Sequence, residues 1–226
     1  MKYKSIIFDL DGTIIDTNHI WNKATYDLIT SRGVTLTPEI QEELSRELKG
    51  VAIHNSCAII KNKFYLDHPV EELITEKKKR ANDLYIAGLQ FIAGFENFHK
   101  RAKSHNLHVG VATNAENHTL NTAINQLNLR HFFGDHIYNF TFVNNVPKPA
   151  PDVYLFTAKQ LGVDPSECIV IEDAPHGIEA ANKAGMFCIG INSGGKPEEL
   201  KEAKFVVDHY DEIDLPRLLN IKKEAK

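Results

Sequence analysis

The stretch Lys4–Thr13, KSIIFDLDGT, decides the fold of this 226-residue chain. Its first half, residues 4–8, is a short apolar run, which is typical of a strand buried on both faces of a parallel sheet. Its second half changes abruptly to acidic and turn-forming residues, which is typical of a loop. The stretch therefore predicts a buried strand that delivers two carboxylates, Asp9 and Asp11, to the carboxyl edge of a sheet.

Alternating strand and helix patterns after residue 90 predict the rest of this sheet. Strands are expected at residues 107–113, 137–142, 168–173, 187–191 and 205–208, with helices at 116–128, 151–162 and 177–185 and a partly helical tail at 211–226. This alternation is typical of a doubly wound, Rossmann-like parallel α/β sheet.

A helical block of about 75 residues interrupts the α/β pattern after the first strand, and inserts of this size form their own subdomain. Its helices are expected at residues 18–32, 38–49, 53–64 and 70–88. We therefore predict an α/β core domain from residues 1–15 and 91–226, and an α-helical cap domain, 16–90, that closes over substrate. The basic run KKKR at 77–80 is interpreted as a solvated helix face, with Glu76 paired to Arg80.

The composition excludes several classes of protein. Hydrophobic residues make up 42% and charged residues 25%, as in ordinary globular domains, and the net charge of −4 argues against a nucleic-acid surface. The three cysteines include no CxxC pair, so a disulfide framework or cysteine zinc site is not expected. With neither a signal peptide nor a run of about 20 apolar residues, the protein is expected to be cytoplasmic, without membrane or protein partners.

Polar residues follow each of the first four predicted strands of the sheet. They are Asp9, Asp11, Gly12 and Thr13, then Thr113 and Asn114, then Lys148, and finally Glu172 and Asp173. The carboxyl ends of parallel strands meet at one edge, so these groups are expected to converge. Gathered carboxylates take up protons or bind a cation, and Mg²⁺ prefers such oxygen ligands.

The same set of residues predicts phosphoryl chemistry. Lys148, the donors of Thr113 and Asn114, and the backbone N–H groups near Gly12 and Thr13 would hold a phosphoryl group. One aspartate of the Asp-x-Asp pair can be a nucleophile, while the other acts as general acid and then base.

Taken together, these residues resemble the haloacid dehalogenase (HAD) superfamily, in the branch with an α-helical cap. The four motifs stand, in chain order, as Asp9-Leu-Asp11-Gly-Thr13, Thr113-Asn114, Lys148-Pro-Ala-Pro-Asp152 and Glu172-Asp173-Ala-Pro-His-Gly177. The resemblance covers essentially the whole chain. It is strongest to the β-phosphoglucomutase, sugar-phosphatase and phosphoglycolate-phosphatase group, which implies a small phosphorylated metabolite as substrate.

The resemblance also implies roles at the matching positions. Asp9 would be the nucleophile and a Mg²⁺ ligand, and Asp11 the general acid/base that binds Mg²⁺ through its backbone carbonyl. Thr113, Asn114 and Lys148 would bind the phosphoryl group. Asp173 would ligate Mg²⁺, with Glu172 beside it, either binding the ion directly or orienting the groups that do.

Two features of the helical block favour a phosphatase over a phosphohexomutase. Mutases of this family bind a second phosphate with two cap cations, but Ile53 and Ala81 stand at those positions here. The missing charges could come from Lys49, His54, Lys61 or Lys77, so the mutase stays an alternative, with a non-catalytic binding protein as a third. The missing cations suggest that the far end of the substrate is not an anion.

Three further features have open or weak interpretations. His19 and His54 could face the site from the cap, and Trp21 could pack or bind substrate. The stretch 190–196, GINSGGK, matches a P-loop pattern, but Pro197 replaces the required Ser or Thr, so a loop after a strand is the better interpretation.

Overall fold

The computed structural model describes residues 2–48, 51 and 53–220, and the chain divides into two compact units. The α/β unit comprises Met1–Asp16 and Gln90–Lys226, and the helical unit is Thr17–Leu89. The chain thus leaves the α/β unit once and returns to it. The Asp16 N–H donates a hydrogen bond of 3.0 Å to the Gln90 carbonyl, so the segment that leaves the α/β unit is bonded to the segment that returns to it.

A six-stranded parallel sheet forms the centre of the α/β unit. Its strands are β1 (Ser5–Phe8), β2 (His108–Thr113), β3 (Ile137–Asn139), β4 (Cys168–Glu172), β5 (Phe187–Ile191) and β6 (Phe205–Val207). The order across the sheet is β3-β2-β1-β4-β5-β6, so β1 lies between β2 and β4. The strand order reverses at β1, and ligands of α/β proteins bind at such switch points. The predicted doubly wound parallel α/β fold is confirmed.

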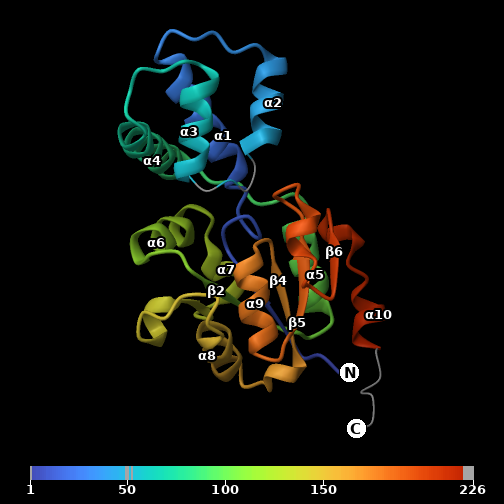
Figure 1. The fold of residues 1–226 in the computed structure, drawn as a ribbon. Helices are drawn as coiled ribbons and strands as arrows, with labels where there is room; N and C mark the ends of the chain where they lie inside the picture. The colour runs from blue at the N-terminus through green and yellow to red at the C-terminus, as the bar shows by residue number, and fades with distance from the viewer. Residues whose placement is uncertain (1, 49–50, 52, 221–226) are drawn as a thin grey trace. The chain divides into compact units, whose positions relative to one another are not determined.

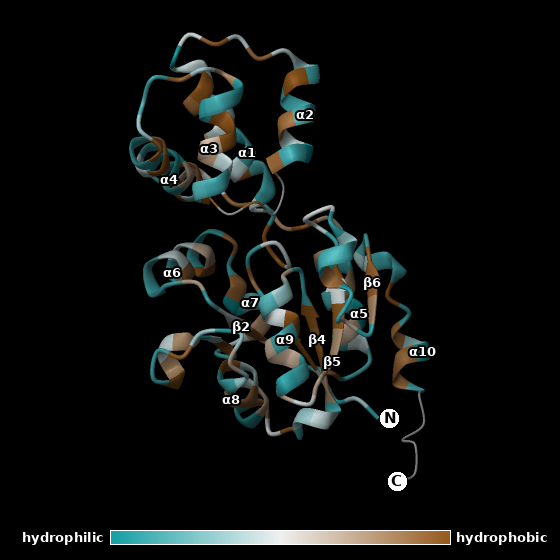
Figure 2. Cartoon of the chain, in the orientation of Figure 1, coloured by the Kyte–Doolittle hydropathy of each residue, from teal (hydrophilic) through white to brown (hydrophobic). Residues whose placement is uncertain are grey.

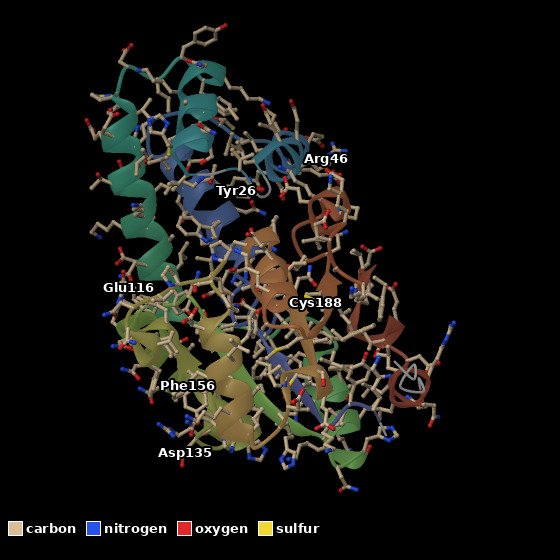
Figure 3. The ribbon with its side chains drawn as sticks, turned by 60° about the horizontal axis from the view of Figure 1, so that its bottom comes forward. Tyr26, Arg46, Glu116, Asp135, Phe156 and Cys188 are labelled. Atoms are coloured by element: carbon tan, nitrogen blue, oxygen red, sulfur yellow. The ribbon has the colours of Figure 1, made fainter. Side chains whose placement is uncertain are left out.

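Helices cover both faces of this sheet. They are α5 (Phe95–Ser104), α6 (Asn117–Gln126), α7 (Leu129–Phe133), α8 (Asp152–Leu161), α9 (Pro175–Lys183) and α10 (Leu215–Leu219), with 3₁₀ turns η1 (Phe140–Val143), η2 (Pro165–Glu167), η3 (Pro197–Leu200) and η4 (Tyr210–Glu212). Helix α9 lies in front of β4 and β5 in Figure 1, and Cys188, labelled in Figure 3, belongs to the core between them. On the opposite face, Phe8 packs edge-on against Phe95 and Phe98 of α5.

The inner residues of the strands are mostly apolar, as burial on both faces requires, while polar residues such as Thr113, Asn139 and Glu172 stand at strand ends. Figure 2 shows them as hydrophobic between helices that mix hydrophobic and hydrophilic residues. Among the described residues, no helix is both long and apolar enough to cross a bilayer.

The described residues of the helical unit form four helices around an apolar core of their own. These are α1 (Asn18–Thr30), α2 (Pro38–Leu48), α3 (Ile53–Lys63) and α4 (Val70–Ala87). Each helix contributes at least one fully buried side chain to the core, such as Leu28, Leu44, Ile60 and Leu73. The Tyr26 hydroxyl, labelled in Figure 3, donates 2.7 Å to the Gln41 carbonyl and joins α1 to α2.

Several predicted elements need correction. The strand expected at 137–142 ends at Asn139, because the Asn139 side chain accepts hydrogen bonds from Thr141 and caps the 3₁₀ turn that follows. Helix α5 was not predicted. In the tail, which was expected to be partly helical, helix α10 spans Leu215–Leu219; residues 221–226, like Lys49 at the end of the helix expected at 38–49, lie outside the described residues.

Candidate active site

The polar residues that follow the strands meet at the carboxyl edge of the sheet. They come together because β1, β2 and β4 are adjacent and parallel, so their ends lie side by side. A cavity of about 220 Å³ opens there. Its lining consists of Asp9, Asp11, Thr113, Asn114, Ala115, Glu172, Asp173, Ala174 and His176.

A buried lysine holds two of these carboxylates. The Lys148 Nζ lies 2.5 Å from Asp9 Oδ1 and 2.7 Å from Glu172 Oε1, and its side chain is fully buried. Beneath it, the Tyr154 hydroxyl donates a 3.0 Å hydrogen bond to the same Glu172 oxygen. The ammonium also lies 4.5 Å from the centre of the Tyr154 ring, within the range of a cation–π contact. Lys148 therefore sits in a fixed position between Asp9 and Glu172.

The cavity perturbs the pKa of each ionisable group. Burial raises the pKa of Asp9 to about 7, although the Lys148 charge opposes the rise. Burial also raises the pKa of Asp11 to about 6, and that of Asp173 well above its ordinary value. For Lys148, burial lowers the pKa, but the carboxylates of Asp9 and Glu172 outweigh it and the net pKa is raised. One ammonium is thus outnumbered by acidic groups, so a further cation would be attracted.

The donor set fits a hard divalent cation. Asp9, Glu172 and Asp173 each offer a carboxylate oxygen, and the three oxygens lie within 4.8 Å of one another. Oxygen ligands of this kind suit Mg²⁺. The Glu172 oxygens already accept hydrogen bonds, Oε1 from Lys148 and Tyr154 and Oε2 from the Ala174 N–H. The hydrogen bond from Lys148 engages Oδ1 of Asp9, and the Asp173 oxygens accept only long hydrogen bonds of 3.3 and 3.5 Å, so Asp9 and Asp173 are the better direct ligands.

The remaining expected site residues lie beside this cluster. Asn114 uses its side chain on the Lys148 backbone, accepting from the N–H at 2.9 Å and donating to the carbonyl at 3.2 Å. Thr113 is buried at the end of β2, where its Oγ1 accepts from the Ala115 N–H. Thr13 Oγ1 donates 3.3 Å to Asp173 Oδ1. These contacts orient the cluster, and Asn114 retains one amide N–H for a ligand.

Gly12 has a specific steric reason to be glycine. Its φ of +82° lies in the left-handed region, and an added Cβ would meet Asp173 Oδ2 at 2.0 Å. The backbone of the loop after β1 therefore lies so close to the Asp173 carboxylate that no side chain fits between them, and the first and fourth motifs are in contact.

Four residues near the site were missed by the sequence analysis as site residues. Tyr154 lies in the cluster itself, and the Tyr210 hydroxyl donates 2.8 Å to the Thr13 carbonyl. Ser193 Oγ lies 3.5 Å from Asp173 Oδ2, in the loop after β5 that the P-loop-like stretch forms. His176 lines the cavity from α9. His176 stands inside the fourth motif and Tyr154 closely follows the third, whereas no spacing pattern marks Tyr210 or Ser193.

The expected cap residues behave differently from one another. His19 and His54 are exposed, while Lys61 donates to the carbonyls of Leu66 and His68. Lys49 lies outside the described residues. The interpretation of KKKR as a solvated face is wrong at Lys77, which is buried, and holds for Lys78 and Lys79, which are exposed, while Arg80 is half-buried.

Arg80 pairs with Glu76 at 2.6 Å, as predicted from their spacing along the helix. Trp21 is half-exposed and lines a cavity of the helical unit together with Lys77. Both interpretations of Trp21, packing and ligand contact, therefore stay open at this point.

The chain is similar in sequence to known proteins. The family model for haloacid dehalogenase-like hydrolases matches residues 6–191. A fructose-1-phosphate phosphatase of Escherichia coli K12 is 29% identical over 198 residues, which cover 84% of this chain and 97% of that protein. A β-phosphoglucomutase of Bacillus subtilis 168 is 28% identical over 225 residues, which cover 95% and 93%.

Solved structures share the fold. A HAD family hydrolase from Deinococcus radiodurans R1, crystallised with phosphate and sodium, superposes with a TM-score of 0.77 at 23% identity and covers 93% of both chains. At this identity the likeness supports the fold alone.

Proposed function

Because the chain belongs to the haloacid dehalogenase-like hydrolase family, we propose that it is a Mg²⁺-dependent phosphatase of a small phosphorylated carbohydrate. The observation that carries this proposal is the cluster at the carboxyl edge of the sheet. There Lys148 bridges Asp9 and Glu172, and Asp173 completes a set of oxygens within 4.8 Å. The names of several relatives, among them the fructose-1-phosphate phosphatase, support the substrate class.

The proposed reaction has two steps. In the first, the Asp9 carboxylate attacks phosphorus, the bond to the ester oxygen breaks, and Asp11 gives its proton to the leaving oxygen. In the second, Asp11 takes a proton from water, the water oxygen attacks the aspartyl-phosphate, and the Asp9–phosphorus bond breaks to release phosphate. The pKa of about 6 at Asp11 suits a group that must be both acid and base near neutral pH.

The fixed groups of the site would stabilise charge during both steps. The Lys148 ammonium neutralises charge on the phosphoryl oxygens, and Thr113 and Asn114 donate hydrogen bonds to them. Mg²⁺, held by Asp9 and Asp173 with the Asp11 backbone carbonyl, would supply a second positive charge. We assign Glu172 to holding Lys148 and the Ala174 N–H in place, since both of its oxygens are already engaged.

We also propose that the helical unit, Thr17–Leu89, is the cap that selects the substrate. It is an independent compact unit inserted between β1 and the rest of the sheet, and it has a core of its own. A cap of this kind excludes water from the first step and admits it for the second.

Phosphate release from a panel of sugar phosphates, phosphoglycolate and nucleotides tests the proposal. We expect release with Mg²⁺, none with chelator, and a loss of at least about 10⁴-fold in kcat for Asp9→Asn. Asp67→Asn, on the surface of the helical unit, is the matched control and should behave as wild type. Release that persists in Asp9→Asn would contradict the mechanism, and equal ligand binding without turnover by both proteins would favour a binding protein.

A phosphohexomutase is the second candidate, supported by the β-phosphoglucomutase relative and by the buried Lys77 of the helical unit. A mutase must retain a bisphosphorylated intermediate while it turns around. Incubation with β-glucose 1-phosphate and a β-glucose 1,6-bisphosphate primer separates the two. Glucose 6-phosphate formed faster than free phosphate would favour the mutase.

A further inference from the structure

Exposed apolar side chains gather near the β3 edge of the sheet in the α/β unit. Among the described residues, six large hydrophobic side chains are exposed, and the three that belong to the α/β unit are Phe142, Val146 and Leu155. All three stand within residues 142–155, on the turn η1, the loop after it and helix α8. Single exposed apolar residues are ordinary, but a group of them indicates a surface that another molecule covers.

The aromatic part of this surface is held in a fixed arrangement. The centre of the Phe142 ring lies 5.3 Å from that of Tyr138 and 5.9 Å from that of Phe156, which is labelled in Figure 3. The Tyr138 and Phe156 ring centres are 5.1 Å apart. Phe142 is nevertheless 54% exposed. Rings that are immobilised beforehand lose little conformational freedom on binding, which is typical of aromatic anchors in protein interfaces.

The outward side of α8 carries opposite charges on either side of an apolar centre. Its charged residues are Asp152, at the start of the helix, and Lys159, seven residues later, and both are exposed. Seven residues are close to two helical turns, so the two side chains lie on the same side of the helix. Leu155 and the half-buried Phe156 stand midway between them. Neither Asp152 nor Lys159 has an ion-pair partner within 4.0 Å in the part of the chain that the structure describes.

This pattern is self-complementary in an antiparallel pair of α8 helices. When a twofold axis passes at the level of Leu155 and Phe156, these apolar residues of the two copies meet at the centre. At 1.5 Å per residue, Asp152 and Lys159 each lie about 5 Å from that level, in opposite directions. Asp152 of one copy therefore stands at the level of Lys159 of the second copy, and symmetry produces the same pair at the other end.

We propose that the protein forms a twofold dimer in which α8 packs antiparallel to α8 of a second copy. The surface involved, here called the α8 face, comprises Phe142, Asp152, Leu155, Phe156 and Lys159. A second copy is the favoured occupant because the α8 face complements itself when it is reversed. A partner surface of one charge sign would instead oppose Asp152 or Lys159 with a like charge. Such a dimer contradicts the expectation from the sequence that the chain has no protein partner, and it does not depend on the proposed phosphatase activity.

Sedimentation velocity tests for the dimer. Between about 2 and 200 μM protein, we expect the mass to rise from the 25.5 kDa of one chain toward twice that value, with a dissociation constant below about 100 μM. Leu155→Asp puts a charge into the apolar centre and should raise the dissociation constant by at least about 30-fold. Ile86→Asp, which changes an exposed apolar residue of the helical unit in the same way, is the matched control and should dimerise like wild type.

Two charge reversals test the antiparallel arrangement. Asp152→Lys leaves lysine facing lysine at both ends of the interface, and Lys159→Asp leaves aspartate facing aspartate. Each variant alone should raise the dissociation constant by about tenfold or more. When the two variants are mixed, each lysine of one faces an aspartate of the other, so the mixture should dimerise like wild type. Lys100→Asp, exposed on α5, is the matched control and should leave the dissociation constant unchanged.

Three results would overturn the dimer. One is a wild-type mass that stays at 25.5 kDa up to about 200 μM, which would leave the α8 face to a different partner. Another is dimerisation of Leu155→Asp as tight as that of wild type. The third is a mixture of the two charge variants that associates no better than either alone. Circular dichroism melting shows that each variant is folded, and none of these measurements depends on phosphate release.

Discussion

Replacing Lys148 by methionine tests the charge cluster on which the proposed chemistry depends. The change removes the ammonium between Asp9 and Glu172 and leaves a side chain of similar length. The carboxylates would then lie within a few ångströms of one another, with Asp173, and without a fixed countercharge. Breaking a buried ion pair costs about 3–5 kcal/mol, because the remaining charge is neither solvated nor paired.

That cost can be converted into a melting temperature. For domains of this size, each kcal/mol of destabilisation lowers Tm by about 2–4 °C, so Lys148→Met should melt about 6–20 °C below wild type. Lys148 lowers the carboxyl pKa values of Asp9, Asp11 and Asp173, so its loss raises them further. A raised carboxyl pKa contributes stability that is complete at low pH and is lost as the pH rises through it. The deficit should therefore be largest at pH 8 and smaller at pH 5.

Calorimetry in the presence of a chelator measures the deficit. Trp21 is the single tryptophan of the chain and lies in the helical unit, so its fluorescence follows that unit separately. Lys100→Met, exposed on α5, is the matched control. A deficit below about 1 kcal/mol at pH 8, or one of equal size at pH 5, would refute the electrostatic reasoning, because it would mean that the carboxylates do not depend on Lys148.

Three other changes have defined outcomes. Tyr154→Phe removes the hydrogen bond to Glu172 but keeps the ring. It should lower the free energy of unfolding, measured in urea, by about 1–2 kcal/mol and lower kcat severalfold. An unchanged free energy of unfolding and an unchanged kcat would show that the hydroxyl is dispensable. Gly177→Ala places a Cβ 1.6 Å from Glu172 Oε1 and should reduce kcat/KM by more than about 100-fold. The control, Gly194→Ala, has open space around the added Cβ and should leave kcat/KM unchanged. Equal kcat/KM values for the two variants would show that Glu172 can move without loss of activity. The raised pKa of Asp9, about 7, predicts that metal-free protein loses stability from about pH 4 to pH 7 and that Mg²⁺ stabilises it more at the higher pH; a Tm series with the opposite slope would contradict this.

The sheet was largely predictable because burial on both faces leaves a distinctive apolar run. The strand expected at 187–191 has the observed bounds, and that expected at 168–173 ends one residue early. Where a side chain redirects the backbone, this pattern fails: the apolar run continues past Asn139, but hydrogen bonds to that side chain begin a 3₁₀ turn. Such a capping contact depends on geometry that a run of residues does not contain.

Helix α5 shows the opposite error, because its pattern was present. Phe95, Phe98 and Ala102 recur at helical spacing and are all fully buried. The residues between them are polar and charged, and two of the three apolar residues are aromatic, a type that favours strands. Gly94, with a φ of +84°, supplies the turn that starts the helix.

The candidate site was predictable to the extent that its residues follow strand ends. Topology alone brings Asp9, Thr113 and Asp173 together once the strands are parallel and adjacent. Tyr154 and Tyr210 do not follow a strand end, and they contact the site through their hydroxyl groups, which donate hydrogen bonds to Glu172 and to the Thr13 carbonyl. Their contribution depends on side-chain direction, which no spacing rule of a single sequence supplies.

The two lysines that are buried among the described residues follow from one physical rule applied to different surroundings. An ammonium removed from water needs a countercharge or must lose its proton. Lys148 has that countercharge in Asp9 and Glu172, and the strand-end positions of those acids allowed the sequence to predict the cluster. Lys77 has the Ser56 hydroxyl, which bears no charge, and a cavity beside it. Lys148 thus keeps its proton through the countercharge of two carboxylates, whereas for Lys77 burial lowers the pKa of the ammonium.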